Sequence, residues 1–420
     1  MNLNTAGMII SLTSKKKWKR SPLLNFGDEK KIIINCKFVD MQKDIYFGMS
    51  SRIARWKLNT PFEKWLSQKA DTSSFWKRIY LYYYCIFDHK YYVGGAKMAY
   101  KAISNHIVAR AITDKAALVK DMIYCLHRFG ISFQDYCIYD FANNSSLEYR
   151  NSFVSDKLRY YYCDILNDPA ILPLMTNKYA CYQKYKKFYK RDVVGCFKKD
   201  DEADFKLFLA SHSRFIYKPI GEHSGHGIEL VDSEKIDADQ FFATKIKAGS
   251  FILEELIIQG KETSLMHPQS INSCRVVTFV VNGDVNIMGA TWRVGAGDSI
   301  KDNAGSGGMY ASINPSNGEV ETDAISYNGT IYEKHPDTGY RFKGFHLPEW
   351  DTALSLVKEM SLYLKGTTLV SWDIAYSNKG WVMVEANDNG DWSIIQSNRK
   401  VGKKDMLYLY MDRYFSMINS

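Results

Sequence analysis

The sequence lacks several features that would assign it to a class at once. No apolar run approaches the roughly 20 residues of a membrane-spanning helix. The early apolar piece "GMIISL" is too short for a signal peptide, and it precedes the first charges instead of following them. The eight cysteines contain no C-x-x-C pair and no histidine at ligand spacing, which argues against a zinc site and against a disulfide framework. We therefore expect a protein of the reducing cytoplasm.

Acidic residues are scarce at the start of the chain. Residues 1–60 hold twelve Lys or Arg but four Asp or Glu, so they carry +8 of the net charge of +9. Nucleic-acid-binding proteins usually have a basic stripe on a folded domain, so the nearly neutral remainder predicts no nucleic-acid partner. The basic start, with "TSKKKWKR" at 13–20, has two interpretations. It is a solvated, poorly ordered segment, or it makes a peripheral contact with anionic lipid at a membrane.

The character of the sequence changes at about residue 165. Residues 1–50 are irregular, whereas 51–165 show apolar residues at three- and four-residue spacing, typical of helices. We predict helices over 93–112, over 114–130 and over 155–167, the second capped by Asp114 and ended by Gly130. Beyond them, short β-rich runs alternate with helical stretches over roughly 250 residues, which predicts an α+β region with more than one core.

The stretch "SWDIAYSNKGWVMVEANDNGDW" (371–392) is a predicted hairpin with unexpected polar residues. Asp373, Glu385 and Asn387 are poor strand formers, although their neighbours are good ones. Because side chains alternate along a strand, Glu385 and Asn387 share a face. The set indicates either a solvent-facing acidic strand pair or a cation site that relieves the repulsion of like charges. Oxygen ligands alone favour Mg²⁺ or Mn²⁺ over zinc or copper.

The length of the turn decides whether Asp373 joins this face. A two-residue loop turns Asp373 away from Glu385. A three-residue loop, which pairs Ser377 with Trp381, places Asp373 opposite Glu385, and Gly380 suits the left-handed end of such a loop. The cation hypothesis therefore requires a three-residue, or otherwise odd, loop.

Two further segments carry chemistry. "RFIYKPIGEHSGHGIELV" (214–231) places Lys218 on a strand before a glycine-rich loop, where backbone N–H groups can approach a phosphate closely. The GK[ST] ending of a P-loop is missing, so this is either an ordinary hairpin or a different phosphate loop. "FILEELIIQGKE" (251–262) ends an apolar strand in two carboxylates. Its exposed backbone can bind adenine and a following Glu can take ribose hydroxyls, but these carboxylates are equally read as surface charges.

The order of these segments resembles the ATP-grasp superfamily. "HPQSINSCRVVTF" (267–279), "WRVGAGDSIKDNAGSGGMYASINPSNG" (292–318) and "HPDTGYRFKGFHLPEW" (335–350) are similar to its sugar-transfer-associated branch from bacterial cell-surface polysaccharide clusters. The resemblance implies an α+β ATP-grasp fold, in which two α+β subdomains clamp ATP, preceded by a mainly helical N-terminal domain. It implies a basic segment over 1–50, the helical domain over 51–165, a lid subdomain over 166–258 and a metal-binding C-terminal subdomain over 259–420.

The resemblance also implies roles for single residues. Lys178, in "LMTNKYACYQKY" (174–185), resembles the first nucleotide lysine. One of two arginines is expected at the transferred phosphoryl group, since arginine fits such oxygens with two donors; a structural ion pair is the alternative for each. The expected nucleotide-binding residues are Lys178, Lys218, Gly225, Gly227, Glu254, Glu255, Leu256, Ile257 and Glu262. The expected metal ligands are Asp373, Glu385 and Asn387, and the expected catalytic residues are Arg275 and Arg293. The expected substrate contacts are Asp302, Asn303, Gly307, Gly308 and His335.

The activity implied is that of an ADP-forming ligase. Such an enzyme uses ATP and Mg²⁺ (or Mn²⁺) to join a small carboxylate to an amine through an acyl phosphate, and in this branch we expect a sugar carboxylate (a uronate) of surface-polysaccharide biosynthesis. Two alternatives remain open. One is a kinase on the same scaffold that phosphorylates a sugar or a lipid-linked hydroxyl. The other is a nucleotide-binding partner of glycosyltransferases without turnover.

Overall fold

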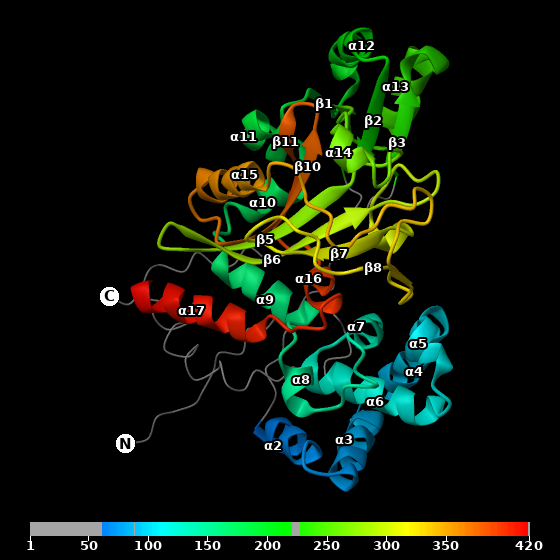
Figure 1. Ribbon diagram of the computed structural model, residues 1–420, viewed down its shortest axis with the longest axis vertical. Helices are drawn as coiled ribbons and strands as arrows, with labels where there is room; N and C mark the ends of the chain where they lie inside the picture. The colour runs from blue at the N-terminus through cyan, green and yellow to red at the C-terminus, as the bar shows by residue number, and fades with distance from the viewer. Residues whose placement is uncertain (1–60, 88, 221–226, 419–420) are drawn as a thin grey trace.

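A computed structural model describes residues 61–87, 89–220 and 227–418 (Figure 1). Three groups of elements follow one another along its long axis: helices at one end, a seven-stranded sheet in the middle and a four-stranded sheet at the far end. The region predicted to be irregular, 1–50, lies outside the described residues. Within the described part, no helix is long and apolar enough to cross a membrane.

The first group is a helical bundle with its own core. Asp114 caps the helix Lys115–Phe129 and Gly130, at φ 72°, ends it, as the sequence predicts. Its buried apolar residues, from Leu66 to Phe153, pack on one another and scarcely on the sheets. Its helices are α2 (Pro61–Ala70), α3 (Ser74–Phe87), α4 (His89–Asn105), α5 (Ile107–Ala111), α6 (Lys115–Phe129), α7 (Phe133–Ile138) and α8 (Leu147–Asn151).

The single helix predicted over 93–112 is wrong, because the structure divides it at His106. The His106 ring accepts a hydrogen bond from the Ala109 amide and so caps α5. The Ile107 amide donates to the Asn328 carbonyl at 2.8 Å, which draws the backbone out of the helix. A contact from more than 200 residues away therefore interrupts a locally helical pattern.

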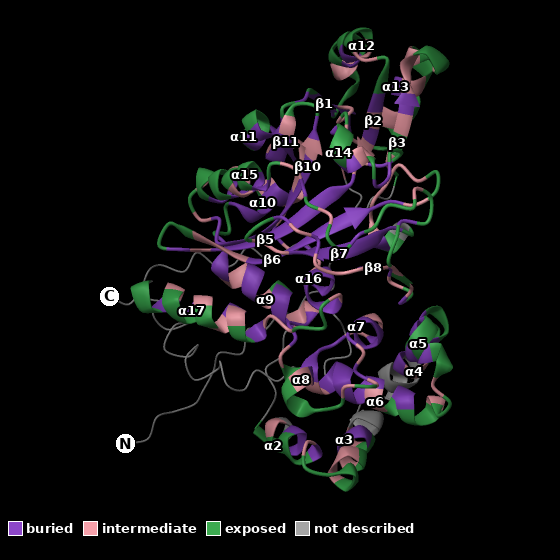
Figure 2. Cartoon of the chain, in the orientation of Figure 1, coloured by how far each residue is buried: buried purple, intermediate pink, exposed green. Residues whose placement is uncertain are grey.

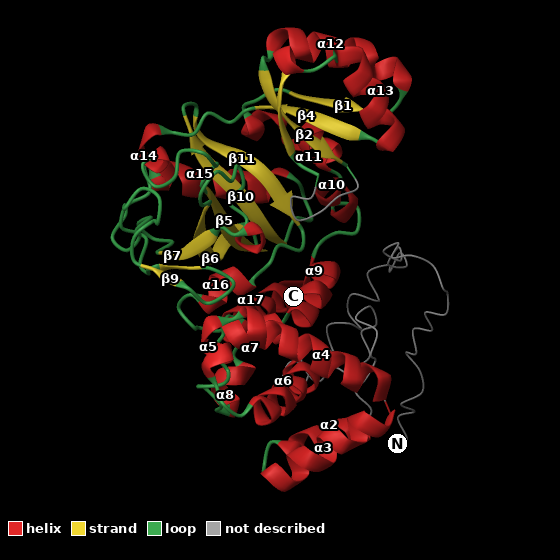
Figure 3. Cartoon of the chain, turned by 90° about the vertical axis from the view of Figure 1, so that its right-hand side faces the viewer, coloured by secondary structure: helices red, strands yellow, loops and turns green. Residues whose placement is uncertain are grey.

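The four-stranded antiparallel sheet has the order β1-β4-β2-β3 and is covered on one face by two helices (Figure 3). Its core is built of phenylalanines; Phe205 on the first helix and Phe242 on the second have ring centroids 5.1 Å apart and pack over Phe251. The elements are β1 (Val193–Cys196), α12 (Glu202–Ser211), β2 (Arg214–Pro219), β3 (Glu229–Asp232), α13 (Ala238–Ala248) and β4 (Phe251–Glu255).

The seven-stranded sheet has the order β11-β10-β5-β6-β7-β8-β9. Asn282 and Gly283, at φ 52° and 79°, form the two-residue turn between β5 and β6. The strands are β5 (Ser273–Val281), β6 (Asp284–Val294), β7 (Met309–Ile313), β8 (Ala324–Ile325), β9 (Ile331–Tyr332), β10 (Leu369–Ser377) and β11 (Gly380–Asn387).

Helices cover both faces of this sheet, so β5 and β10 are buried at all but one position each (Figure 2). One face packs on α10 (Leu172–Thr176), α11 (Lys178–Tyr189) and α15 (Trp350–Tyr363). The other packs on α9 (Asp156–Leu166), α16 (Ser393–Ser397) and α17 (Lys404–Ile418). Asp373 belongs to this second face, at the end of the sheet nearer to the four-stranded sheet.

Lys404, at the start of α17, gives a pH-dependent prediction. Its ammonium donates to Asn151 Oδ1 at 3.1 Å, and burial lowers its pKa to about 7, with the charge of Arg128 adding to the effect. In the unfolded chain a lysine titrates near about 10.4. Between these two pKa values the unfolded chain binds more protons than the folded protein. The free energy of unfolding therefore increases as the pH rises from about 7 to about 10.

We expect Lys404→Met to flatten this rise. The unfolding free energies of the variant and the parent, from urea titrations, should differ most near pH 7 and converge only above about pH 10, by on the order of 1 kcal/mol per pH unit in between. Lys400→Met, which removes a more exposed lysine paired with Asp140, is the matched control. A difference between variant and parent that does not change with pH would refute the assignment.

Candidate functional site

The β10–β11 hairpin carries the three polar residues singled out in the sequence. Its turn is shorter than predicted: Ser377 pairs with Gly380, so the loop has two residues and the three-residue loop is wrong. The register is corrected further along, because β11 bulges at Val384, between the pairs Ile374–Met383 and Asp373–Glu385. A β-bulge adds one residue to one strand. Asp373 therefore lies opposite Glu385, as the cation hypothesis requires, but the bulge and not the length of the turn produces this pairing.

The three polar side chains converge on one face. Asn387 Nδ2 lies 3.3 Å from Asp373 Oδ2 and 3.4 Å from Glu385 Oε1. Asp373 is fully buried, and Glu385 and Asn387 are partly buried. The register places Glu385, Asp373 and Arg275 side by side on β11, β10 and β5. A row of two carboxylates and a guanidinium thus crosses the sheet.

Both predicted catalytic arginines bind Asp373. Arg275 donates to both carboxylate oxygens, from Nε and Nη2 at 2.9 Å each, and Arg293 Nη2 donates to Oδ2 at 3.0 Å. Burial alone would raise the pKa of Asp373, but the two guanidinium groups outweigh it and hold that pKa at about 2. Asp373 is therefore ionised, and the arginines are fixed in place beside the acidic face.

The donor set suits a hard divalent cation. Burial and the facing charge of Asp373 raise the pKa of Glu385, and a cation beside this carboxylate would relieve that repulsion. Carboxylate and amide oxygens are the ligands that Mg²⁺ prefers. Since both Asp373 oxygens already accept from Arg275, Glu385 and Asn387 would be the principal holders of the ion.

The two predicted nucleotide lysines lie at the junction of the sheets. Lys218, on β2, pairs with the buried Glu254 at 2.9 Å, and its charge partly offsets the raised pKa of Glu385. Lys178 begins α11 behind its cap Asn177 and donates to the Pro219 carbonyl at 3.3 Å. Both ammonium groups therefore lie beside β2, that of Lys218 on the strand itself and that of Lys178 at the end of the strand.

The predicted adenine segment connects the two sheets. Leu256 and Ile257 follow β4, and the chain then enters the short helix α14 (Lys261–Ser264) before β5. The Glu255 carboxylate accepts from the Asp192 amide at 2.9 Å and pairs with a lysine of the hairpin turn. A Cβ on Gly260 would lie 2.3 Å from a ring carbon of Tyr376, so only glycine fits this linker. Glu262 is exposed on α14.

Arg191, which the sequence analysis missed, joins the two sheets. Its buried guanidinium donates to Glu254 Oε2 at 3.0 and 3.2 Å. It also donates to the carbonyls of Met383 at 2.5 Å and of Val384 at 3.1 Å, the two residues at the bulge. Arg191 thus holds the bulge that brings Glu385 opposite Asp373. It precedes β1 with no motif around it, so no local signal marks it.

The predicted substrate contacts divide into two groups. Asp302 accepts from the Ser273 amide at 2.9 Å and lies 3.7 Å from Arg293 Nε, so it joins the arginine cluster. Asn303 caps a short turn by accepting from the Gly305 amide. Gly307 is left-handed at φ 95°, and a Cβ on Gly308 would lie 2.5 Å from the Asp302 carbonyl oxygen.

His335 is one of two histidines that hold the loop after β6 by hydrogen bonds to its backbone carbonyls. Its Nε2 bonds to the Gly295 carbonyl at 2.9 Å, and His267, 5.1 Å away between ring centroids, bonds in the same way to Gly297. Burial lowers the pKa of His335. The two imidazoles fix the turn that follows Arg293, so His335 supports the arginine cluster from behind.

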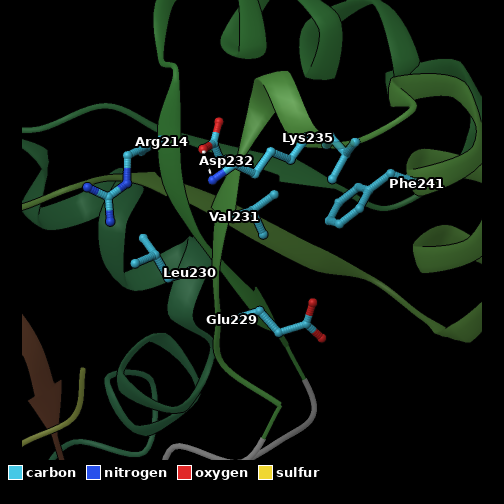
Figure 4. A pocket seen from close by; sticks show the side chains of 8 residues that line it. Arg214, Glu229, Leu230, Val231, Asp232, Lys235 and Phe241 are labelled. Atoms are coloured by element: carbon cyan, nitrogen blue, oxygen red, sulfur yellow. Dashed lines mark ion pairs between the residues drawn. The ribbon is translucent and has the colours of Figure 1, made fainter. Parts of the chain in front are cut away.

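The glycine-rich loop is only partly within the described residues. Gly225 lies outside them, whereas Gly227 is left-handed at φ 70° beside Pro219. The nearby hollow on the outer edge of the four-stranded sheet, lined by residues of β2, β3 and α13, does not include the acidic face (Figure 4). There Lys235 pairs with Asp232 at 3.1 Å. The predicted site residues Lys218, Asp373 and Glu385 therefore lie between the two sheets and not in this hollow.

Comparisons with known proteins define the class. The family described as sugar-transfer associated ATP-grasp matches residues 157–406, which is more than half of the chain. The chain belongs to this family. The predicted ATP-grasp fold and family are confirmed. A comparison with curated proteins finds no match.

Solved structures with some similarity are ATP-grasp ligases. D-alanyl-alanine synthetase A from Vibrio cholerae is 12% identical with a TM-score of 0.40, over 60% of this chain and 67% of that one. D-alanine-D-alanine ligase from Helicobacter pylori is 13% identical with a TM-score of 0.36, over 57% and 61%. Membership of the family rests on the sequence match and not on these two likenesses.

Proposed function

We propose that the protein is an ADP-forming ligase that activates a sugar carboxylate as an acyl phosphate and joins it to an amine or amino acid. The observation that carries the proposal is the row Glu385–Asp373–Arg275, bordered by Lys218 at the junction of two sheets. It combines anionic oxygens for a cation with fixed cations for phosphate oxygens. Membership of the sugar-transfer associated branch supports a saccharide substrate in surface-polysaccharide biosynthesis.

Each residue has a role in this scheme. Lys178 and Lys218 bind phosphate oxygens of ATP, while the linker at Leu256 and Ile257 offers its backbone to adenine and Glu262 is the candidate for the ribose. A Mg²⁺ ion at Glu385 and Asn387 would neutralise phosphate charge.

The reaction has two steps. In the first, a substrate carboxylate oxygen attacks the γ-phosphorus and the bond to the β–γ bridging oxygen breaks, leaving ADP and an acyl phosphate. In the second, the amine attacks the acyl carbon, loses a proton and expels phosphate. Arg275 and Arg293 are placed to stabilise the transferred phosphoryl group, because a fixed donor costs no reorganisation during the reaction.

A product assay tests the proposal. The purified protein with Mg-ATP is screened against uronic acids combined with amino acids, and ADP, free phosphate and the coupled product are measured. A ligase releases ADP and phosphate in equal amounts when both substrates are present. Formation of AMP would refute it. ADP without free phosphate, together with a stable phosphoester, would establish the kinase alternative. No turnover with any pair, in a protein that binds ATP, would favour the non-catalytic partner.

Lys218 supplies a prediction for ATP binding. We expect Lys218→Met to raise the KM for ATP by about tenfold or more, since a charge-assisted contact to a phosphate contributes roughly 1.5–3 kcal/mol. The KM is measured from initial rates of ADP formation. The matched control is Lys206→Met, which removes a more exposed lysine from α12 that pairs with Glu202 and Asp239. An equal change in both variants would contradict the assignment.

A further inference from the structure

The helices α2 and α3, at the end of the molecule farthest from the four-stranded sheet, carry a continuous patch of aromatic side chains (Figure 1). We call it the aromatic patch and define it as Phe62, Trp65, Phe75, Trp76 and Tyr83. Its rings touch in a chain: the centroid distances are 5.4 Å for Tyr83–Phe62, 5.9 Å for Phe62–Trp65, 5.6 Å for Trp65–Trp76 and 5.7 Å for Trp76–Phe75.

The aromatic patch is exposed although the helices that carry it are anchored. Leu66, Tyr80 and Leu81 bury the opposite sides of α2 and α3 in the helical core, with exposures of 2%, 1% and 8%. Phe62, Trp65 and Phe75 remain 51%, 44% and 57% exposed. Packing of the bundle therefore does not require these three rings. A contiguous exposed apolar patch on a protein surface usually marks an interaction site.

The charge around the patch indicates the kind of partner. The ten residues before α2 contain Arg52, Arg55 and Lys57 and no acid, and residues 1–60 together carry +8. Helices α2 and α3 carry one acid, Glu63, against four basic residues, of which Lys69 and Arg78 are exposed. Asp71, between the two helices, is neutralised by Arg128 at 2.7 Å. A second copy of the same chain would bring the same exposed cations, Lys69 and Arg78, against this face, so self-association is disfavoured. The complementary partner is anionic.

We infer that the α2–α3 aromatic patch, bordered by Lys69 and Arg78, docks on the surface of a membrane rich in anionic lipid. Trp and Tyr prefer the boundary between headgroups and acyl chains. A basic, aromatic helical face lies in that plane, with binding from both buried apolar area and attraction to anionic headgroups. The ATP-grasp sheets would then project away from the bilayer, at the other end of the long axis (Figure 3).

Vesicle co-sedimentation of the full chain tests the inference. Vesicles of phosphatidylcholine alone are compared with vesicles containing 30% phosphatidylglycerol. We expect binding to the anionic vesicles that weakens at 0.5 M salt, where charges are screened. The triple variant Phe62→Ser, Trp65→Ser, Phe75→Ser should bind them at least tenfold more weakly. The control Leu207→Ser, Ile331→Ser removes two side chains, 69% and 68% exposed, from the sheet regions and should bind like the parent.

Three outcomes would overturn the inference. The first is a parent protein that binds anionic vesicles no better than neutral ones. The second is a triple variant that binds as well as the parent, which would assign all attraction to the charges. The third is a concentration-dependent dimer in light scattering that the triple variant abolishes, which would make the patch a self-association face. Thermal unfolding of each variant is recorded so that loss of the fold is not mistaken for loss of binding.

Discussion

The Glu385→Gln variant is expected to lose Mg²⁺-dependent ADP formation by about 10²- to 10³-fold, because loss of a charged ligand at a catalytic cation removes about 3–4 kcal/mol of transition-state stabilisation. The substitution keeps the shape of the side chain and removes its charge. It also relieves the repulsion from Asp373 that raises the pKa of Glu385. The variant should therefore be at least as stable as the parent while it loses activity.

The measurement is a titration of Mg²⁺ at saturating ATP, with thermal unfolding recorded in parallel. Glu359→Gln is the matched control, since it removes an exposed glutamate of α15 that pairs with Lys187. An active Glu385→Gln enzyme with an unchanged requirement for Mg²⁺ would contradict the cation site. A fall in stability together with activity would indicate a structural role for Glu385.

The Arg191→Met variant is expected to lose both stability and activity. Removing the guanidinium leaves Glu254 with Lys218 as its ion-pair partner and leaves the Met383 and Val384 carbonyls without this donor. Breaking a buried ion pair from one side typically costs about 3–5 kcal/mol. Without the hydrogen bonds from Arg191 the bulge at Val384 can relax, and Glu385 then moves from its place opposite Asp373. We expect activity to fall at least tenfold below the melting temperature of the variant.

A positioning role and a merely structural one are separated by the response to Mg²⁺. If Arg191 positions Glu385, the Mg²⁺ concentration for half-maximal activity should rise in Arg191→Met at a temperature where the protein is folded. Arg191→Lys, which restores the charge but not the fork of donors, should recover part of the stability and little of the Mg²⁺ response. Arg214→Met, on the exposed start of β2, is the control. An unchanged Mg²⁺ response would limit Arg191 to stability.

Several parts of the fold follow from local sequence. The cap Asp114, the terminating Gly130 and the Asn282-Gly283 turn all act through backbone conformations that neighbouring residues set. The helix start at Asn177 is of the same kind. The predictions for Asp114 and Gly130 succeed because each helix end is set by contacts within five residues along the chain.

The errors in prediction have the opposite origin. The helix over 93–112 is broken by a hydrogen bond from Ile107 to Asn328. The hairpin register depends on a bulge held by Arg191, which is about 190 residues away in the chain. Counting loop residues assumes a regular ladder between the turn and Asp373, and it cannot see such a bulge. The face was predicted correctly, but the reason given for it was wrong.

The sequence by itself determined the chemical character of the candidate site: acidic and amide oxygens on one hairpin, one lysine on an earlier strand and another in the segment before it, and their order along the chain. Side-chain alternation and turn chemistry are local, so these features can be read without a fold. Only the tertiary structure decided the partners of the buried charges. Because β5 lies beside β10 and β6 beside β5, both arginines reach Asp373. Its ionised carboxylate accepts hydrogen bonds from Arg275 and Arg293, which leaves Glu385 and Asn387 as the principal ligands for a cation. Buried charges must be paired, and which pairs form depends on which strands become neighbours.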